Sequence, residues 1–144
     1  MTVTSLFLSP KGRISRSQFW LGILGVAALA GCGIAVAFWT PFAYGSLPFL
    51  LLAFIATYMI AIKRLHDRNK SGWWTLVFLW APGVTDRLSD KVIEESATWW
   101  ILVLIGSVLT IWGAVELGFR RGTDGENKYG PDPLNTHDVT APAV

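Results

Sequence analysis

The chain has 144 residues, of which 52% are of apolar type and 15% are charged, and its formal net charge is +2. A soluble domain of this length is ordinarily about one quarter charged, whereas here the charges gather between apolar runs close to the roughly 20 residues that cross a bilayer. Composition therefore favours a single membrane-embedded domain over a soluble one. The lone cysteine, Cys32, excludes an intrachain disulfide and a cysteine-cluster metal site.

The first apolar run, residues 19–39, has the length of a helix that crosses a bilayer. Basic residues precede it, and the Ala-Val-Ala stretch at 35–37 resembles a signal-peptidase site. The apolar run continues past this stretch into Phe38, so we expect the segment to be retained as a span. Pro41 is expected to end the helix, because the residue before a proline is pushed out of the helical region.

The second run, 42–62, and the fourth, 97–118, are also long enough to span a bilayer. The third run is shorter, because its apolar part covers only 73–84 and Pro82 interrupts it. It therefore has two interpretations. It is either a half-span that turns back, or a full span over 71–92 that is kinked at Pro82.

The distribution of basic residues favours the full span. Lys and Arg concentrate in cytoplasmic loops, because basic segments resist translocation. With four spans and both chain ends inside, ten of the twelve basic residues lie on the cytoplasmic side, and only Arg87 and Lys91 lie outside. If the third run turned back, Arg120 and Arg121 would lie outside instead. We therefore predict an all-α, polytopic bundle of four transmembrane helices with the N- and C-termini in the cytoplasm.

This bundle is expected to form one transmembrane domain over residues 1–133. The polar residues 134–144 show no periodicity and predict a flexible cytoplasmic tail. Within the fourth run, Glu116 precedes Arg120 by one helical turn, a spacing that predicts an ion pair at the end of the helix.

Two of the spans carry small residues at every fourth position. Small residues at this spacing let helix backbones approach closely, so van der Waals packing can hold them together in lipid. The pattern leaves open whether the two faces pair with each other or across a homo-oligomer, and Ala and Gly are common in membrane helices in any case. The positions are Ala27, Gly31 and Ala35 in the first run and Gly106, Thr110, Ala114 and Gly118 in the fourth.

Three polar blocks share the cytoplasmic face in this topology: KGRISRSQFW at 11–20, KRLHDRNKSGWW at 63–74 and RRGTDGENKYGPDP at 120–133. Their composition and order resemble the signature blocks of the bacterial family known as domain of unknown function 805. The resemblance spans residues 11–133 and implies a small inner-membrane protein with no established activity. One departure is the acidic insert at 86–96, which makes the third and fourth spans the least transferable part.

The three blocks supply the candidate binding residues of a cytoplasmic cap. Arginines would provide charge, the His, Asp and Asn side chains would form a hydrogen-bond network, and tryptophans would set the depth in the membrane. Basic segments attract anionic lipid headgroups by about 1 kcal/mol per residue, and a serine at a helix start leaves amides that favour anions. The candidates are Arg13, Arg16, Arg64, His66, Asp67, Arg68, Ser71, Trp73, Trp74, Asn127, Tyr129 and Asp132.

Catalysis and metal binding are less well supported by the same residues. His66 and Asp67 are suitable types for an acid–base pair, but neighbours on a helix point about 100° apart. The pattern favours a structural role, in which Arg64, His66 and Asp67 hydrogen-bond to the other two blocks. A metal site would need more ligands than His66, Asp67 and either Asp132 or Glu126 supply. No phosphate-binding loop or dinucleotide fingerprint is present, so we expect no cofactor.

Two further alternatives remain open. A small oligomeric channel or transporter would need a polar path, for which the spans offer few residues beyond Thr57, Tyr58, Ser107 and Thr110. A membrane enzyme would use His66 as its base. Nucleic-acid binding is disfavoured by the low net charge and by basic residues that lie against the membrane. We predict a multi-pass protein of the bacterial inner membrane whose cap docks anionic lipid headgroups or a membrane-protein partner, with a homo-oligomer as one possibility.

Overall fold

The computed structural model describes residues 3–39 and 43–134, and within these ranges the chain is helical without a β-strand. The exit block contributes one isolated antiparallel bridge, between Asn127 and Gly130. The predicted all-α class is therefore confirmed. The predicted flexible tail, apart from its first residue, lies outside the described residues.

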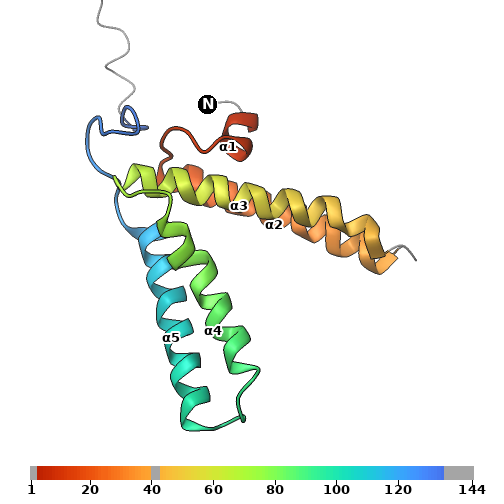
Figure 1. The fold of residues 1–144 in the computed structure, drawn as a ribbon. Coiled ribbons are helices and arrows are strands. Elements are labelled where there is room, and N and C mark those ends of the chain that lie inside the picture. The colour runs from red at the N-terminus through yellow and green to blue at the C-terminus, as the bar shows by residue number, and fades with distance from the viewer. Residues whose placement is uncertain (1–2, 40–42, 135–144) are drawn as a thin grey trace, which may run out of the picture.

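The N-terminal half is a helical hairpin of α2 (Arg16–Trp39) and α3 (Leu47–Asp67), which run side by side in Figure 1. A short 3-10 turn, η1 (Ala43–Ser46), leads into α3, and a short helix that the sequence analysis did not predict, α1 (Val3–Leu8), lies against the hairpin. Glycines allow the close approach of α2 and α3, because a Cβ at Gly33 would lie 2.9 Å from the Cβ of Phe49.

Local sequence explains where these helices begin. Ser15 and Gln18 form a capping box before α2, in which the Ser15 amide donates to Gln18 Oε1 at 2.9 Å and the Gln18 amide donates to Ser15 Oγ at 3.3 Å. Pro48 lies in the first turn of α3, where its missing N–H costs least. At its other end α3 continues past the predicted limit of residue 62 as far as Asp67.

The C-terminal half is a second hairpin. Its first arm becomes helical at Trp74, passes through the π-helical turn η2 (Leu76–Trp80) and continues as α4 (Ala81–Ser89). The wide turn ends two residues before Pro82, where the missing N–H of the proline interrupts the regular hydrogen bonding of the helix. The arm has 16 helical residues, or about 24 Å. The return arm is α5 (Ala97–Ala114), which ends in a second π-helical turn, η3 (Val115–Phe119).

The two hairpins meet at one end and diverge from it, so that the molecule has the outline of an L in Figure 1. The start of α2, the end of α3, the end of η3 and residues 120–134 all lie at this shared end. A small buried core lies there too, made of Ile14, Phe19, Ile60, Ala61, Leu65, Phe78 and Leu117. The connection between α4 and α5 lies far from it.

Three helical segments of the described chain are long and apolar enough to cross a membrane: Arg16–Trp39, Tyr44–Asp67 and Ala97–Phe119. They correspond to the first, second and fourth predicted runs. The third predicted run forms the shorter arm that contains α4, which is not among these three segments.

The two predicted small-residue faces do not pack against each other within the chain. The three positions on α2 are exposed, and a Cβ added at Gly31 would meet no atom within 4 Å. On the last helix, Gly106 lies against Thr85 of α4 and Gly118 lies against Trp20 of α2, whereas Thr110 and Ala114 are exposed. Contact between chains through the α2 positions Ala27, Gly31 and Ala35 stays a prediction.

Candidate functional site

The three polar blocks meet at the shared end of the hairpins, which we call the cap, and its first centre is the carboxylate of Asp67. Arg13 approaches Oδ1 through Nε at 3.1 Å and Nη2 at 3.0 Å, and Arg64 donates to Oδ2 from one turn earlier on α3. All three residues are buried, with at most 4% of each exposed. A carboxylate held by two guanidinium groups forms strong, directional hydrogen bonds. Arg13 and Arg64 therefore belong to the buried interior of the cap, where they pair with Asp67.

Arg13 also binds the exit block, residues 120–133. Its Nη1 donates to the carbonyls of Gly125 at 2.6 Å and Gly130 at 3.2 Å, and its Nη2 donates to the carbonyl of Thr123. Thr123 in turn donates its amide and its hydroxyl to the Asp67 carbonyl, at 2.8 and 3.0 Å. The entry block, the end of α3 and the exit block are thus bonded to one another.

The rest of the exit block folds onto His66. Asn127 Nδ2 donates to the His66 carbonyl at 3.0 Å and to Thr123 Oγ1 at 2.8 Å. The ring of Tyr129 stacks on the imidazole, with centroids 3.7 Å apart and planes 6° from parallel. Nδ1 of His66 is buried and has no hydrogen-bond partner in the described part of the chain, and Asp67 is engaged by the arginines. The imidazole therefore stacks on Tyr129, while the neighbouring carboxylate of Asp67 is held by the arginines.

Asp132 stabilises the turn at the end of the exit block. Its carboxylate accepts hydrogen bonds from the backbone amides of Leu134, at 2.9 Å, and Gly125, at 3.1 Å. The bond from Leu134 is the largest cause of a pKa for Asp132 below its usual range. Gly125 and Gly130 have φ angles of +74° and +131°, which a residue with a side chain rarely adopts. The carboxylate is thus committed to backbone contacts.

The second centre of the cap is Glu116 in η3, whose side chain is fully buried. Arg68 approaches Oε1 through Nε at 3.2 Å and Nη2 at 3.0 Å, and Lys70 Nζ lies 3.0 Å from the same oxygen. Arg120 lies 3.1 Å from Oε2, so the predicted pair with Glu116 is confirmed. Lys70 also lies over the ring of Trp74, 4.6 Å from its centroid. One buried carboxylate therefore joins three cations from two segments.

Five successive carbonyls, of residues 117–121 at and just after the end of the last helix, accept hydrogen bonds from side chains at the start of α2 and the end of α3. The last carbonyls of a helix lack partners within it and form the negative end of its dipole, so they favour cationic donors. These bonds fasten the second hairpin to the first. The pairs are Arg64 to Leu117 and Arg120, Trp20 to Gly118, Arg16 to Phe119, and Arg68 to Arg121.

Several polar residues of the cap were not predicted as binding candidates, among them Glu116, Lys70, Thr123 and Lys63. Lys63, one turn before Asp67, is fully buried, and its Nζ donates to the carbonyls of Ser5 and Leu6 at the end of α1. An apolar stretch before the first polar block was the only signal for α1. Lys63 therefore holds α1 on the hairpin.

The remaining candidates face outward to different degrees. Arg16 and Trp73 are exposed, Ser71 is half-buried, and Trp74 packs against the core. Further exposed cations that were not predicted as binding residues surround the cap. We call the exposed cations of the cap its outward cations: Lys11, Arg16, Arg120, Arg121 and Lys128. In the described ranges, no group of three or more His, Cys, Asp or Glu side chains is arranged to hold a metal ion.

Apolar helices of spanning length that end in one ion-paired cap define a small, helical integral membrane protein. The chain belongs to the family described as proteins of unknown function (DUF805), whose match covers residues 7–131. The resemblance seen in the three polar blocks is thereby confirmed.

Relatives from Escherichia coli (strain K12) match along nearly the whole chain. The protein named Uncharacterized protein YiiR is 30% identical, over 96% of this chain and 93% of its own length. Inner membrane protein YhaI is 27% identical over 92% of each chain, and inner membrane protein YhaH is 24% identical over 92% of this chain and 93% of its own. No solved structure matches the chain significantly. The chain is a multi-pass protein of the bacterial inner membrane.

Proposed function

We propose that the cap docks anionic lipid headgroups at the cytoplasmic face of the inner membrane, and that the protein acts as a membrane scaffold rather than as an enzyme. The observation that carries this proposal is the separation of charge along the molecule. Ten basic and five acidic described residues lie in or beside the cap, whereas the other described charges, two basic and four acidic, lie in residues 86–95. A surplus of positive charge at one end is typical of the cytoplasmic side.

The same proposal includes four spans with both termini inside. The arms that contain α4 and α5 lie side by side, and their connection lies far from the cap in Figure 1. This arrangement supports a third run that crosses to the far side rather than one that turns back. Its 16 helical residues cover about 24 Å, which a locally thinner bilayer or polar residues near the end can accommodate.

The buried and the exposed cations of the cap have different roles. Arg13 and Arg64 both pair with Asp67, and Arg64 also donates to the Leu117 carbonyl of the second hairpin, so these buried cations hold the hairpins together. The outward cations defined above are exposed, although Arg120 pairs with Glu116 and Arg121 with Asp124. A basic residue near an anionic surface is worth about 1 kcal/mol. The hydrogen bond from Arg16 to the Phe119 carbonyl is long, at 3.4 Å. The exposed Trp73 has the amphipathic ring that prefers the boundary between lipid and water.

A wet transport path is less well supported, although α4 and α5 border a groove of about 580 Å³ that hydroxyl side chains line. Three of these hydroxyls already donate to carbonyls of their own helices: Thr85 to Pro82, Ser89 to Asp86 and Thr110 to Gly106. Hydroxyls bonded in this way fit a lipid-facing or helix-facing surface.

The test is stabilisation of the detergent-solubilised protein by added phosphatidylglycerol, compared with phosphatidylcholine. We expect phosphatidylglycerol to raise the melting temperature more, and the Lys11→Gln/Arg16→Gln/Lys128→Gln variant to lose the part of this difference that the cap contributes. The matched control, Lys11→Arg/Arg16→Lys/Lys128→Arg, keeps the charges and should keep the effect. An equal preference for phosphatidylglycerol in all three proteins would refute headgroup docking at the cap.

A further inference from the structure

The two arms of the L enclose an open wedge on the side where α3 faces α4. It has a volume of about 390 Å³. Several lining side chains are about half exposed, among them Phe54 at 53% and Trp80 at 51%. Because α3 is long and apolar enough to cross a bilayer, lipid acyl chains reach this surface. The apolar and aromatic lining consists of Phe54, Tyr58, Leu79, Trp80, Val84 and Leu88.

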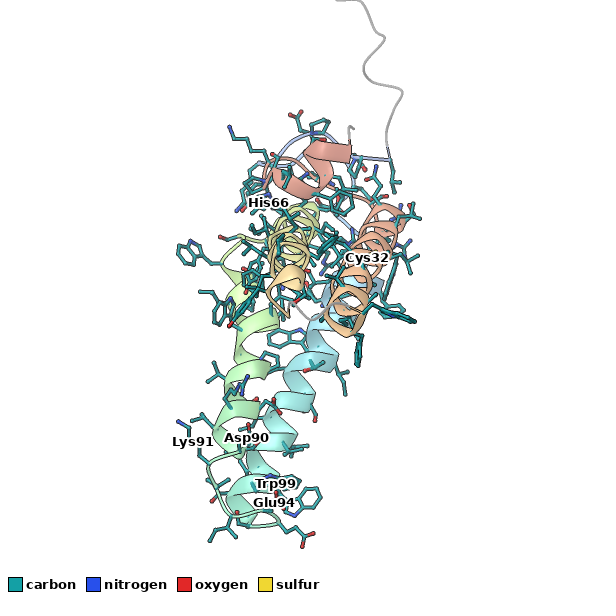
Figure 2. All side chains as sticks on the ribbon, turned by 90° about the vertical axis from the view of Figure 1, so that its right-hand side faces the viewer. Cys32, His66, Asp90, Lys91, Glu94 and Trp99 are labelled. Carbon is teal, nitrogen blue, oxygen red and sulfur yellow. The ribbon has the colours of Figure 1, made fainter. Side chains whose placement is uncertain are left out.

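The charged residues in this lining are both cations. Arg87, near the end of α4, and Lys91, in the turn that follows it, lie at the end of this arm away from the cap, and neither forms an ion pair with a described residue. Asp86 lines the other groove, between α4 and α5. Figure 2, which faces the open side of the L, shows Lys91 on the half of the second hairpin that is remote from His66. The end of this arm that is remote from the cap therefore contributes two cations, Arg87 and Lys91, to the wedge.

We infer that the wedge binds one anionic phospholipid. Its acyl chain packs against Phe54, Trp80 and Leu88, and its phosphate lies at Arg87 and Lys91. Charge complementarity selects the headgroup, because an arginine fork and an ammonium group suit a phosphate. The lipid fills the space where the two hairpins diverge beyond the buried core that joins them. This site is independent of headgroup docking at the cap, with which it shares no residue.

Native mass spectrometry of the delipidated full chain tests the inference, because it counts bound lipids and copies of the chain together. With phosphatidylglycerol, we expect one bound lipid, besides any held at the cap, whose affinity falls about 30-fold in Arg87→Gln/Lys91→Gln. Val84→Trp, which fills the wedge without changing a charge, should lose the same lipid. The swap Arg87→Lys/Lys91→Arg and the cap variant Lys11→Gln/Arg16→Gln should both retain it.

Three results would overturn the inference. The first is unchanged phosphatidylglycerol binding in Arg87→Gln/Lys91→Gln. The second is full binding in Val84→Trp, because a lipid attracted only to surface charge does not need the wedge. The third is a dimer that Val84→Trp dissociates, because a second copy would then occupy the wedge. Since Val84→Trp leaves the charges in place, it decides the question even if the charge variant does not fold.

Discussion

Replacing Asp67 by asparagine removes the one negative charge that two buried guanidinium groups share. The side chain keeps its size, but Arg13 and Arg64 lose the charged partner that lies within 3.1 Å of Arg13. Breaking a buried ion pair on one side costs about 3–5 kcal/mol, because a charge remains buried without compensation. Both arginines keep backbone carbonyl acceptors, so we expect the lower end, about 3 kcal/mol. That loss is a large share of a typical stability of about 5–15 kcal/mol.

The assay is equilibrium unfolding of the purified protein in mixed micelles of a mild detergent and dodecyl sulfate. Fluorescence of the eight tryptophans reports the transition. Asp124→Asn is the matched control, because it makes the same change in a pair with Arg121 whose side chains are 78% and 71% exposed. Exposed pairs contribute little, about 0–1 kcal/mol. If Asp67→Asn costs no more than Asp124→Asn, the buried pair does not hold the cap together.

Three further predictions concern the packing and the topology. Gly122→Ala should destabilise the protein by about 1–3 kcal/mol in the same assay, because the new Cβ would overlap the Asp67 carboxylate. The control Gly31→Ala, in open space on α2, should be neutral or slightly stabilising. Lys63→Met should release α1 from the hairpin and expose the N-terminal segment to protease, because its ammonium group holds the carbonyls at the end of that helix. In a background without the native cysteine, an impermeant thiol reagent should label Glu94→Cys on intact cells but not Glu126→Cys.

Each of these predictions has a contrary result. Equal stability of the two alanine variants would mean that the exit block can move away from the Asp67 carboxylate at no cost. Unchanged protection of the N-terminal segment in Lys63→Met would mean that apolar packing alone holds α1. Labelling of Glu126→Cys without Glu94→Cys would place the exit block outside, and the proposed cytoplasmic cap would be wrong.

Local features of the chain predicted the helical class, the membrane location and the family. Length and apolar composition alone identify the segments that become α2, α3 and α5, because a backbone in lipid must satisfy its hydrogen bonds within each helix. The ion pair between Glu116 and Arg120 was predictable because one helical turn separates the two residues. The membership of residues 7–131 in the family was also visible in the order of the three polar blocks.

The sequence alone did not distinguish the roles of similar residues in the cap. Arg13 and Arg16 lie three positions apart in one block, yet Arg13 is buried against Asp67 and Arg16 is exposed. No local pattern separates them, because the partner that buries Arg13 is 54 residues away. Glu116 likewise collects Arg68 from a distance of 48 residues. Only the tertiary structure decides which charges are neutralised inside the cap and which face outward, because burial depends on the meeting of helix ends that are remote in the chain.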